Sequence, residues 1–240
     1  MDIKVMKFGG TSLRSEATRK YAYRHIMEAA ASHKVIVVVS AMGRYADSYA
    51  TDTLLSLGSD LLSREERARL VSIGEQLAAI IVCSELLELG QRAFSLNFID
   101  SGIRTDNHYD YAKVIKLDNK EIKMKLREYD IIVVGGYIAT SYEHKVTTLG
   151  RGGSDYSAVL FAHMLGLKEV DIYTDVDGVY DHDPKLNECA VRYDRLNYDE
   201  MLNMKSRVLH DRSVLFAKKH GIRIHLKGTF SNHTGTVIEG

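Results

Sequence analysis

The sequence is poor in cysteine, proline and tryptophan, and it carries no net charge. Lys plus Arg number 32 and Asp plus Glu also number 32, so bulk charge attracts neither nucleic acid nor an acidic membrane. The two cysteines, Cys83 and Cys189, argue against a disulfide framework and are typical of the reducing cytoplasm. Any bound anion must therefore be held by positive groups that are placed locally.

Long apolar runs and a leader segment are also lacking. No apolar run approaches the ~20 residues that span a bilayer. Met1 to Val5 leads directly into a strand pattern, which predicts no signal peptide. The ten histidines are scattered without the spacing of metal ligands, so we assign no metal-binding residue. These absences predict a cytoplasmic protein with no membrane and no nucleic-acid partner.

Strand and helix patterns alternate along most of the chain. Residues 35–39 form a near-continuous β-branched run, as in a strand that is buried on both faces. The alternation predicts one compact α/β unit, with two lobes around a cleft and a mostly parallel sheet between helices. The segment from Arg104 to Leu117 departs from it and predicts a hairpin at the edge of the sheet. The patterns place strands at 3–8, 35–39, 93–99, 130–134, 170–173, 222–226 and 235–238, and helices at 12–31, 65–89, 119–128 and 154–165.

Ligands of open parallel sheets bind beyond the carboxyl ends of the strands, so the segment after each strand is informative. The first strand ends in the hexapeptide KFGGTS at 7–12. Its two glycines allow the backbone to approach a ligand closely, Thr11 or Ser12 would cap the next helix, and Lys7 adds a full charge. A phosphate site and an ordinary strand-to-helix turn with a surface lysine explain this segment about equally well.

The strongest local signal is TTLGRGGSDYSA at 147–158, where three glycines surround Arg151. Consecutive glycine amides form an anion-binding nest, and Arg151 can hold a carboxylate through two parallel hydrogen bonds. Asp155, in the first turn of the next helix, is also explained by the helix dipole. Because a loop so rich in glycine is costly to order without a ligand or tight packing, this segment favours a binding function.

Two other segments are only suggestive. Ser40 stands at the end of the second strand, although a flexible loop is the simpler explanation there. YTDVDGVY at 173–180 places acidic residues at a strand end before a glycine turn, which suits a ribose or a hydrated metal ion but also a solvated turn. No GxxxxGK[ST], GxGxxG or protein-kinase His-Arg-Asp pattern is present, which excludes the commonest nucleotide-binding folds.

Together and in this order, the segments resemble the amino acid kinase superfamily, and more narrowly the aspartokinase catalytic domain. KFGGTS, VVVSAM, TLGRGGSD and YTDVDGVY all match that family, and the likeness spans nearly the whole chain. Further matches are SIGE at 72–75, YDEM at 198–201 and VLH at 208–210. The resemblance implies a three-layer α/β/α sandwich with a mainly parallel sheet of about eight strands.

The resemblance also implies a reaction. ATP, with Mg²⁺, would phosphorylate the side-chain carboxylate of L-aspartate to give 4-phospho-L-aspartate and ADP. This is the first step towards lysine, threonine and methionine in the aspartate family of amino acids. The family further suggests a homodimer.

Individual residues take implied roles from the same resemblance. Lys7 would stabilise the transferring phosphoryl group, and Asp155 would orient Lys7. Glu75 would hold the α-amino group of the substrate, and Arg151 its α-carboxylate. The other expected substrate-binding residues are Ser40, Gly152, Gly153 and Ser154, and the expected nucleotide-binding residues are Gly9, Gly10, Thr11, Thr174, Asp175, Asp177, Tyr180, Lys185 and Arg207.

The chain departs from the family near its end. Aspartokinases usually carry a stretch like SLGAKVLHP, whereas the segment from Met204 to Asp211 is a few residues shorter. The lysine of that stretch, which contacts ATP phosphates in the family, aligns with Arg207, and Lys205 is the other candidate. The sequence ends at Gly240, where a catalytic domain would end, so we expect no ACT regulatory domain and no inhibition by lysine or threonine.

Two other functions stay open. Another amino acid kinase would act on glutamate, acetylglutamate, carbamate or UMP, although Glu75 and Arg151 together favour a free α-amino acid. A non-catalytic ligand-binding or partner subunit would explain the altered segment at Arg207. The retained Lys7, Arg151 and Asp155 argue against that second alternative.

Overall fold

The computed structural model describes residues 2–182, 184, 186–187, 189–204 and 208–240. Its centre is an eight-stranded sheet in the order β12-β14-β13-β9-β1-β2-β6-β3. All neighbouring strands are parallel except β13 and β14. The strands are β1 (Ile3–Phe8), β2 (Lys34–Val39), β3 (Ala93–Leu96), β6 (Ile131–Gly135), β9 (Glu169–Thr174), β12 (Arg195–Asn197), β13 (Arg223–Gly228) and β14 (Thr236–Glu239).

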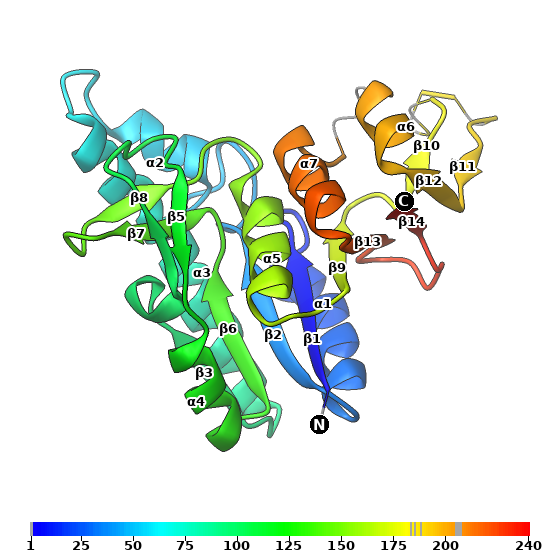
Figure 1. Ribbon diagram of the computed structural model, residues 1–240, viewed down its shortest axis with the longest axis horizontal. Helices are drawn as coiled ribbons and strands as arrows, with labels where there is room; N and C mark the ends of the chain where they lie inside the picture. The colour runs from blue at the N-terminus through cyan, green and yellow to red at the C-terminus, as the bar shows by residue number, and fades with distance from the viewer. Residues whose placement is uncertain (1, 183, 185, 188, 205–207) are drawn as a thin grey trace.

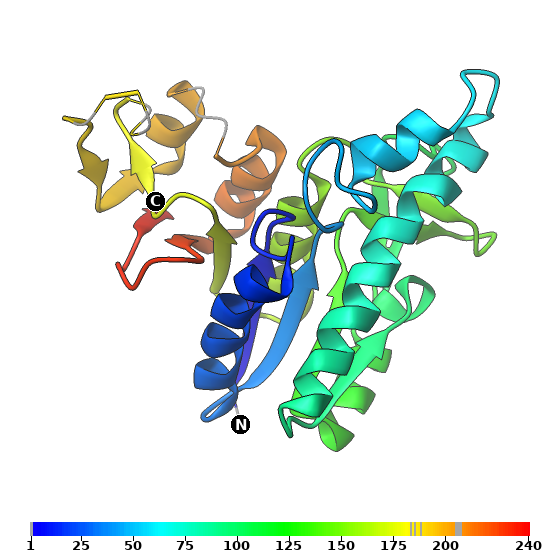
Figure 2. The same ribbon diagram turned by 180° about the vertical axis from the view of Figure 1, so that it is seen from behind.

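Helices cover both faces of this sheet. Figure 1 shows α5 (Gly153–Met164) and α7 (Asp211–His220) in front of it, and Figure 2 shows α1 (Glu16–Ala30) and α3 (Arg64–Glu88) on the opposite face. The shorter helices are α2 (Thr51–Leu57), α4 (Lys120–Glu128) and α6 (Tyr198–Asn203). The arrangement confirms the predicted three-layer α/β/α sandwich with a mainly parallel eight-stranded sheet.

The alternation of side chains along buried strands builds two cores, one on each face of the sheet. In β2, residues 35, 37 and 39 join a cluster with Tyr23 and Ile26 of α1. Ile36 and Val38 join the other cluster, with Leu160 of α5. All five β2 residues from 35 to 39 are fully buried, which explains the unbroken β-branched run in the sequence.

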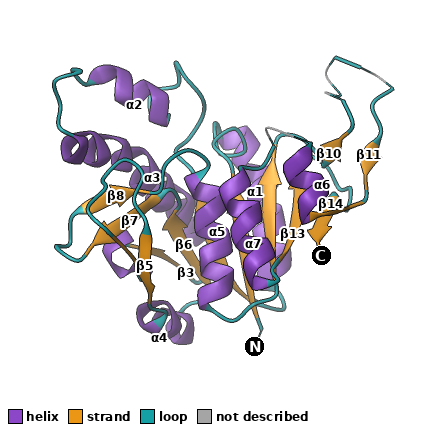
Figure 3. Ribbon diagram, turned by 45° about the horizontal axis from the view of Figure 1, so that its top comes forward, coloured by secondary structure: helices purple, strands orange, loops and turns teal. Residues whose placement is uncertain are grey.

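Four further strands form a separate sheet in the order β5-β4-β7-β8. They are β4 (Ile103–Thr105), β5 (Val114–Leu117), β7 (Ile138–Ser141) and β8 (Val146–Thr148), and β4 follows the short 3-10 helix η1 (Phe98–Ser101). The expected hairpin exists as the antiparallel pair β4 and β5, but β4 pairs with β7 and not with the edge of the main sheet. Figures 1 and 3 show this sheet beside α2 and α3, at the far end from β10 (Val179–Tyr180) and β11 (Arg192–Tyr193).

Helix α1 begins later than the sequence pattern predicted. Residues 9–13 turn back on themselves, because the Ser12 amide donates to the Gly9 carbonyl and the Leu13 amide to the Gly10 carbonyl. The helix then starts behind Ser15, whose side chain accepts from the Thr18 amide while the Thr18 hydroxyl accepts from the Ser15 amide. The later start leaves residues 9–14 as a loop between β1 and α1.

Helix α3 matches the helix predicted at 65–89 to within one residue at each end. By length and composition alone it is long and apolar enough to cross a membrane, and half of its apolar window is buried inside the structure. It begins with a capping box between Ser63 and Glu66, and its buried face packs against β6 and β3. Helices that serve as the core of a folded domain pass the same test.

Candidate active site

The carboxyl ends of the central strands meet at one edge of the main sheet. β1, β2, β6 and β9 are neighbours and parallel, so the segments after them leave the sheet on the same side. Figure 1 shows the arrowhead of β1 at the upper edge, and Figure 3 brings that edge forward. Three of the four sequence segments singled out above follow β1, β2 and β9 and therefore meet at this edge. The fourth, 147–158, follows β8 of the second sheet and leads into α5, and it reaches the same edge, where Asp155 lies 2.6 Å from Lys7.

The loop after β1 packs tightly on the loop after β2. The Gly43 amide donates to the Gly10 carbonyl at 2.8 Å. A Cβ atom on Gly10 would lie 2.5 Å from the Ala41 carbonyl oxygen and 2.6 Å from that of Gly43, so no larger residue fits there without moving the backbone. Ser12 anchors the other end of the loop through a buried 2.6 Å hydrogen bond between its hydroxyl and that of Thr229.

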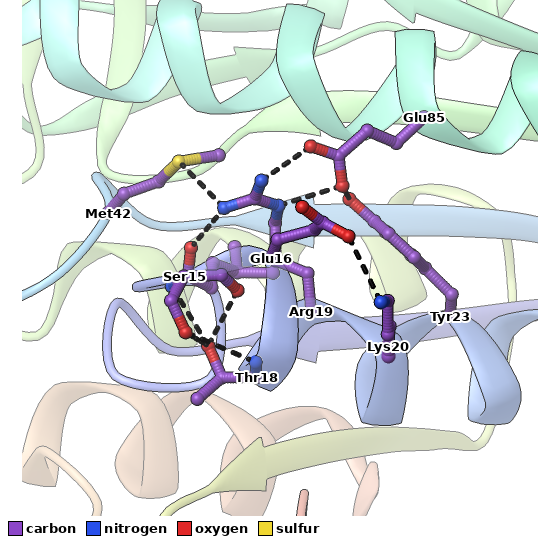
Figure 4. Close-up of polar contacts among 9 residues, drawn as sticks. Ser15, Glu16, Thr18, Arg19, Lys20, Tyr23, Met42 and Glu85 are labelled. Carbon is purple, nitrogen blue, oxygen red and sulfur yellow. Dashed lines mark hydrogen bonds and ion pairs between the residues drawn. The ribbon is translucent and has the colours of Figure 1, made fainter.

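A second contact fixes this loop from behind. Arg19 of α1 forms a two-pronged ion pair with Glu85 of α3 at 2.5 and 2.9 Å, and it donates to the Leu13 carbonyl (Figure 4). The Tyr23 hydroxyl donates to the same carboxylate at 2.6 Å. Burial alone would raise the pKa of Glu85, but the hydrogen bonds from Arg19 and Tyr23 outweigh it and lower that pKa. The network ties the glycine loop to the helix that carries Glu75.

Lys7 and Asp155 form a buried ion pair at the centre of the site. The Lys7 ammonium lies 2.6 Å from Oδ1 of Asp155, and each side chain is only about a tenth exposed. Lys7 is the second-last residue of β1, and Asp155 lies in the first turn of α5. Because the ammonium lies below Gly9, a Cβ on that glycine would approach it to 3.5 Å. Asp155 thus fixes the position of the Lys7 ammonium at the carboxyl end of β1.

A cavity of about 410 Å³ opens beside this pair. All the residues expected to act in catalysis or substrate binding line it, namely Lys7, Ser40, Glu75, Arg151, Gly152, Gly153, Ser154 and Asp155. Thr51, Asp52, Leu55 and Tyr137 also line it and were not anticipated. They come from α2 and from the turn after β6. Neither segment contains a recognisable sequence motif.

Glu75 is a buried carboxylate with an incomplete set of partners. One oxygen, Oε1, accepts from the Ala41 amide at 3.4 Å and from the Thr51 hydroxyl at 3.3 Å. The other, Oε2, is buried and has no hydrogen-bond partner among the described residues. Burial raises the pKa of Glu75 to about 7, and the two hydrogen bonds only partly oppose that rise. Such a group is poised to receive a cation.

Arg151 is exposed and forms no hydrogen bond or ion pair with any residue in the described part of the chain. It shares the 410 Å³ cavity with Glu75. With respect to the described residues, the cavity thus offers a guanidinium without a partner and a carboxylate with one unpartnered oxygen, in addition to the Lys7 ammonium. A small ligand with an anionic and a cationic group would satisfy both.

A larger cavity of about 700 Å³ lies on the other side of Lys7. Six of the expected nucleotide-binding residues line it: Gly9, Gly10, Thr11, Thr174, Asp175 and Tyr180. Arg44, Asp181, His182 and Met204 line it too and were not predicted. Arg44 pairs with Asp175 at 3.0 Å across the opening. Lys7 is shared by both cavities, so it stands where their contents would meet.

Of the other three expected nucleotide-binding residues, Asp177 is described by the structure and does not line this cavity. Asp177 lines a neighbouring hollow, where it accepts a 2.6 Å hydrogen bond from the Tyr180 hydroxyl and lies 3.5 Å from Arg192. Through this hydrogen bond the Asp177 carboxylate raises the pKa of Tyr180 and fixes the position of its hydroxyl group. Lys185 and Arg207 lie outside the described residues, as does the other candidate, Lys205.

The sequence was compared with models of known protein families. Residues 2–228 match the model described as the amino acid kinase family. The match covers nearly all of the sequence, and the site lies within it. The chain belongs to the amino acid kinase family.

Relatives within that family are more specific. Aspartokinase 1 of Bacillus subtilis is 37% identical over 245 residues, an alignment covering 99% of this chain and 61% of the relative. The aspartokinase of Helicobacter pylori is 39% identical, covering 98% and 58%. The chain therefore spans about 60% of the length of these curated relatives.

Solved structures agree on the architecture. The aspartate kinase of Synechocystis aligns with a TM-score of 0.84 and 32% identity over 99% of this chain and 40% of that one. Aspartokinase III of E. coli, in complex with aspartate and ADP, aligns with a TM-score of 0.83 over 100% of this chain and 65% of that one. At 22% identity the second likeness supports the fold alone.

Proposed function

We propose that the chain transfers the γ-phosphoryl group of ATP to the side-chain carboxylate of L-aspartate, giving 4-phospho-L-aspartate and ADP. The observation that carries the proposal is the meeting of two cavities at Lys7, one lined by the glycine loop and one by Glu75 and Arg151. Relatives named aspartokinase match along the whole chain, which supports the same acceptor. The reaction would be the first step towards lysine, threonine and methionine.

The acceptor follows from the charges of the smaller cavity. The α-ammonium of an amino acid would pair with Glu75, whose Oε2 has no partner in the described part of the chain. The α-carboxylate would pair with Arg151, for which a two-pronged hydrogen bond is the favoured geometry. Held at both α-groups, the substrate would direct its side-chain carboxylate towards Lys7. Ser40, Ser154 and the amides of Gly152 and Gly153 would complete the polar lining.

The chemistry requires charge neutralisation more than proton transfer. The aspartate side chain has a reference pKa of ~3.9, so it is ionised at neutral pH and no general base is needed. One carboxylate oxygen forms a bond to the γ-phosphorus while the bond from that phosphorus to the β,γ-bridging oxygen breaks, and ADP leaves. Both reactants are negative, so positioning and positive charge provide most of the catalysis. Lys7, oriented by Asp155, is placed to supply that charge.

The nucleotide would occupy the larger cavity. The amides around Gly9, Gly10 and Thr11 would receive its phosphates, as backbone amides do in other anion sites. Thr174, Asp175 and Tyr180 would line the nucleoside side, with Asp177 supporting Tyr180 from behind. Lys185 and Arg207 stay predicted phosphate or nucleotide contacts.

Mg²⁺ fits this site as a companion of the nucleotide. The described residues contain no group of three His, Cys, Asp or Glu side chains that could hold a metal ion by themselves. Asp175 and Asp181 do line the nucleotide cavity, and Mg²⁺ commonly takes one or two carboxylates together with phosphates and water. When bound there, the ion would neutralise phosphate charge.

The remaining proposals concern organisation. Residues 1–240 would form a single catalytic domain with two lobes around the paired cavities, acting in the cytoplasm.

A homodimer is supported by an exposed stripe on α3, formed by Ile73, Ile80 and Leu87. These residues recur every seven positions, so an antiparallel copy centred on Ile80 would set Ile73 against Leu87. Ile80→Glu should then convert a dimer to a monomer in sedimentation, and an unchanged mass would contradict it.

The direct test of the reaction traps its product. The chain would be incubated with MgATP, hydroxylamine and separate L-aspartate, L-glutamate or N-acetylglutamate, and the acyl-hydroxamate measured. A strong signal with L-aspartate alone is expected. A signal with another acid would transfer the proposal to that acceptor. Silence with every acid, while ATP still binds, would replace the proposal with a non-catalytic binding function.

A further inference from the structure

The loop that carries Arg151 is rich in glycine. Three of its four residues from 150 to 153 are glycine, and Gly150 and Gly152 have left-handed φ values of 77° and 68°. Glycine loses more conformational freedom on folding than any other residue, so such a loop needs outside contacts to keep one shape. Since Arg151 makes no ion pair with any residue that the structure describes, those contacts must act on the loop backbone and its flanks.

Arg212, at the start of α7, makes contacts on both sides of this loop. Its guanidinium donates to the carbonyl of Leu149, the residue before the loop, and to the Ala112 carbonyl at 3.1 Å. The same group lies 4.2 Å from the ring centre of Tyr156, in the first turn of α5 after the loop. It also lies 4.9 Å from the ring centre of Tyr111, so the guanidinium contacts two aromatic rings.

The glycines of the loop are shaped to the same surroundings. A Cβ on Gly150 would lie 2.1 Å from the ring of Tyr111. A Cβ on Gly152 would lie 2.2 Å from Cβ of His210, the residue that caps α7. The loop therefore rests directly on Tyr111 and on the beginning of α7, with Arg212 joining the two.

We propose that Arg212 is a positioning residue for Arg151: by binding the two flanks of loop 150–153, it sets the guanidinium of Arg151 for the substrate's α-carboxylate. This inference rests on the proposed function, because it assigns Arg151 that ligand. Arg212 itself lines neither cavity. Its loss should therefore weaken binding of the amino acid and leave binding of ATP unchanged.

A purely structural role predicts a different pattern. If Arg212 only stabilised the fold, its removal would lower the melting temperature and change the kinetic constants for both substrates together, or for neither. Arg212 donates hydrogen bonds from a charged group to two carbonyls, and losing such bonds corresponds to about a tenfold or larger effect at the dependent site. The expected signature is a tenfold rise in KM for L-aspartate alone.

A double-mutant cycle isolates the dependence on Arg151. Arg212→Gln, Arg151→Ala and the double variant would be compared for KM of L-aspartate and of ATP. Arg212→Gln should have no further effect once Arg151 is absent. A control is Arg195→Gln, which removes an exposed arginine paired with Glu239 and should change neither constant. An unchanged KM for L-aspartate in Arg212→Gln, or an equal rise in the Arg151→Ala background, overturns the inference.

Hydrogen exchange provides a readout that needs no turnover. The amides of residues 149–156 should exchange faster in Arg212→Gln than in the unaltered chain, while those of α1 keep their rate. If the unaltered chain has no activity on L-aspartate, the proposed function fails, and unchanged exchange over 149–156 would separately overturn the positioning role. Should Arg212→Gln fail to fold, Arg212→Lys replaces it, because lysine keeps the charge but cannot hold two carbonyls and two rings at once. No change in either measurement with that variant would equally overturn the inference.

Discussion

Replacing Glu75 with glutamine should make the folded chain more stable and less active. Burial raises the pKa of Glu75 to about 7 from an ordinary 4.5. Each pKa unit corresponds to about 1.4 kcal/mol, so the ionised carboxylate costs the folded state about 3 kcal/mol above pH 7. The cost is absent below pH 4.5, grows between pH 4.5 and 7, and is constant above. Glutamine has no charge and removes it.

Comparing two pH values separates this effect from the shape of the new side chain. If the glutamine NH2 group takes the position of Oε2, its hydrogen-bond donors lack an acceptor. The resulting loss of unfolding free energy is the same at every pH. The change in unfolding free energy caused by Glu75→Gln should therefore be about 2–3 kcal/mol more favourable at about pH 8.5 than at about pH 5. Urea titrations at both pH values measure it.

A matched control lies on the same helix. Glu88 is exposed at the end of α3, so Glu88→Gln should show little difference between the two pH values. If Glu75→Gln behaves like that control, the buried carboxylate is not held at a raised pKa, and the reasoning is wrong.

The same carboxylate should control the use of L-aspartate. Because the free protein must present an ionised Glu75 to the substrate ammonium, kcat/KM for aspartate should rise as the pH increases through about 7. In Glu75→Gln this step should vanish, and KM for aspartate should increase by about 10²-fold, the equivalent of leaving a buried charge unpaired. A variant with a normal KM for aspartate would contradict the assignment of Glu75.

Three further changes follow from the contacts around Lys7 and the glycine loop. Glu85→Gln should lower the unfolding free energy by about 2 kcal/mol at neutral pH. That loss should fade as the pH falls below the ordinary pKa of 4.5, since the stabilising carboxylate has a lowered pKa and is protonated only in acid; equal losses in urea titrations at neutral and acid pH would refute this. Gly10→Ala should raise KM for ATP about tenfold, because its Cβ would lie 2.5 Å from the Ala41 carbonyl, and an unchanged KM would show that this loop does not contact nucleotide. Asp155→Asn should cost about 3 kcal/mol in thermal unfolding by leaving the buried Lys7 ammonium without its counter-charge, whereas an unaltered melting temperature would mean that the pair is solvated.

Much of the fold is legible in the sequence because its strands are buried on both faces. The β-branched run of β2 and the alternation of strand and helix sufficed to predict the layers. Segments with weak patterns were not predictable. β7 and β8 are short, and the pairing of β7 with β4 is a non-local contact that no local pattern encodes. The Arg104–Leu117 hairpin was therefore assigned to the wrong sheet.

The candidate site divides in the same way. Residues within motifs, such as Lys7 and Arg151, could be named from the sequence because their spacing after strands is informative. Arg44 and Thr51 could not, because they enter the cavities from loops and short helices whose path depends on tertiary packing. Nor does the sequence reveal that Glu75 keeps one oxygen without a partner among the described residues, since that property belongs to the packed helix around it.

The account depends most on Lys7 standing between the two substrates. The decisive measurement is the rate of acyl-phosphate formation from L-aspartate with both substrates saturating, in the unaltered chain, in Lys7→Ala and in Lys123→Ala, which removes an exposed lysine on α4. The account predicts a fall of about 10³-fold in Lys7→Ala, the size expected when a charge that stabilises the transferring group is lost. Lys123→Ala should match the unaltered chain. An equal rate in Lys7→Ala would contradict the claim that phosphoryl transfer occurs where the two cavities meet.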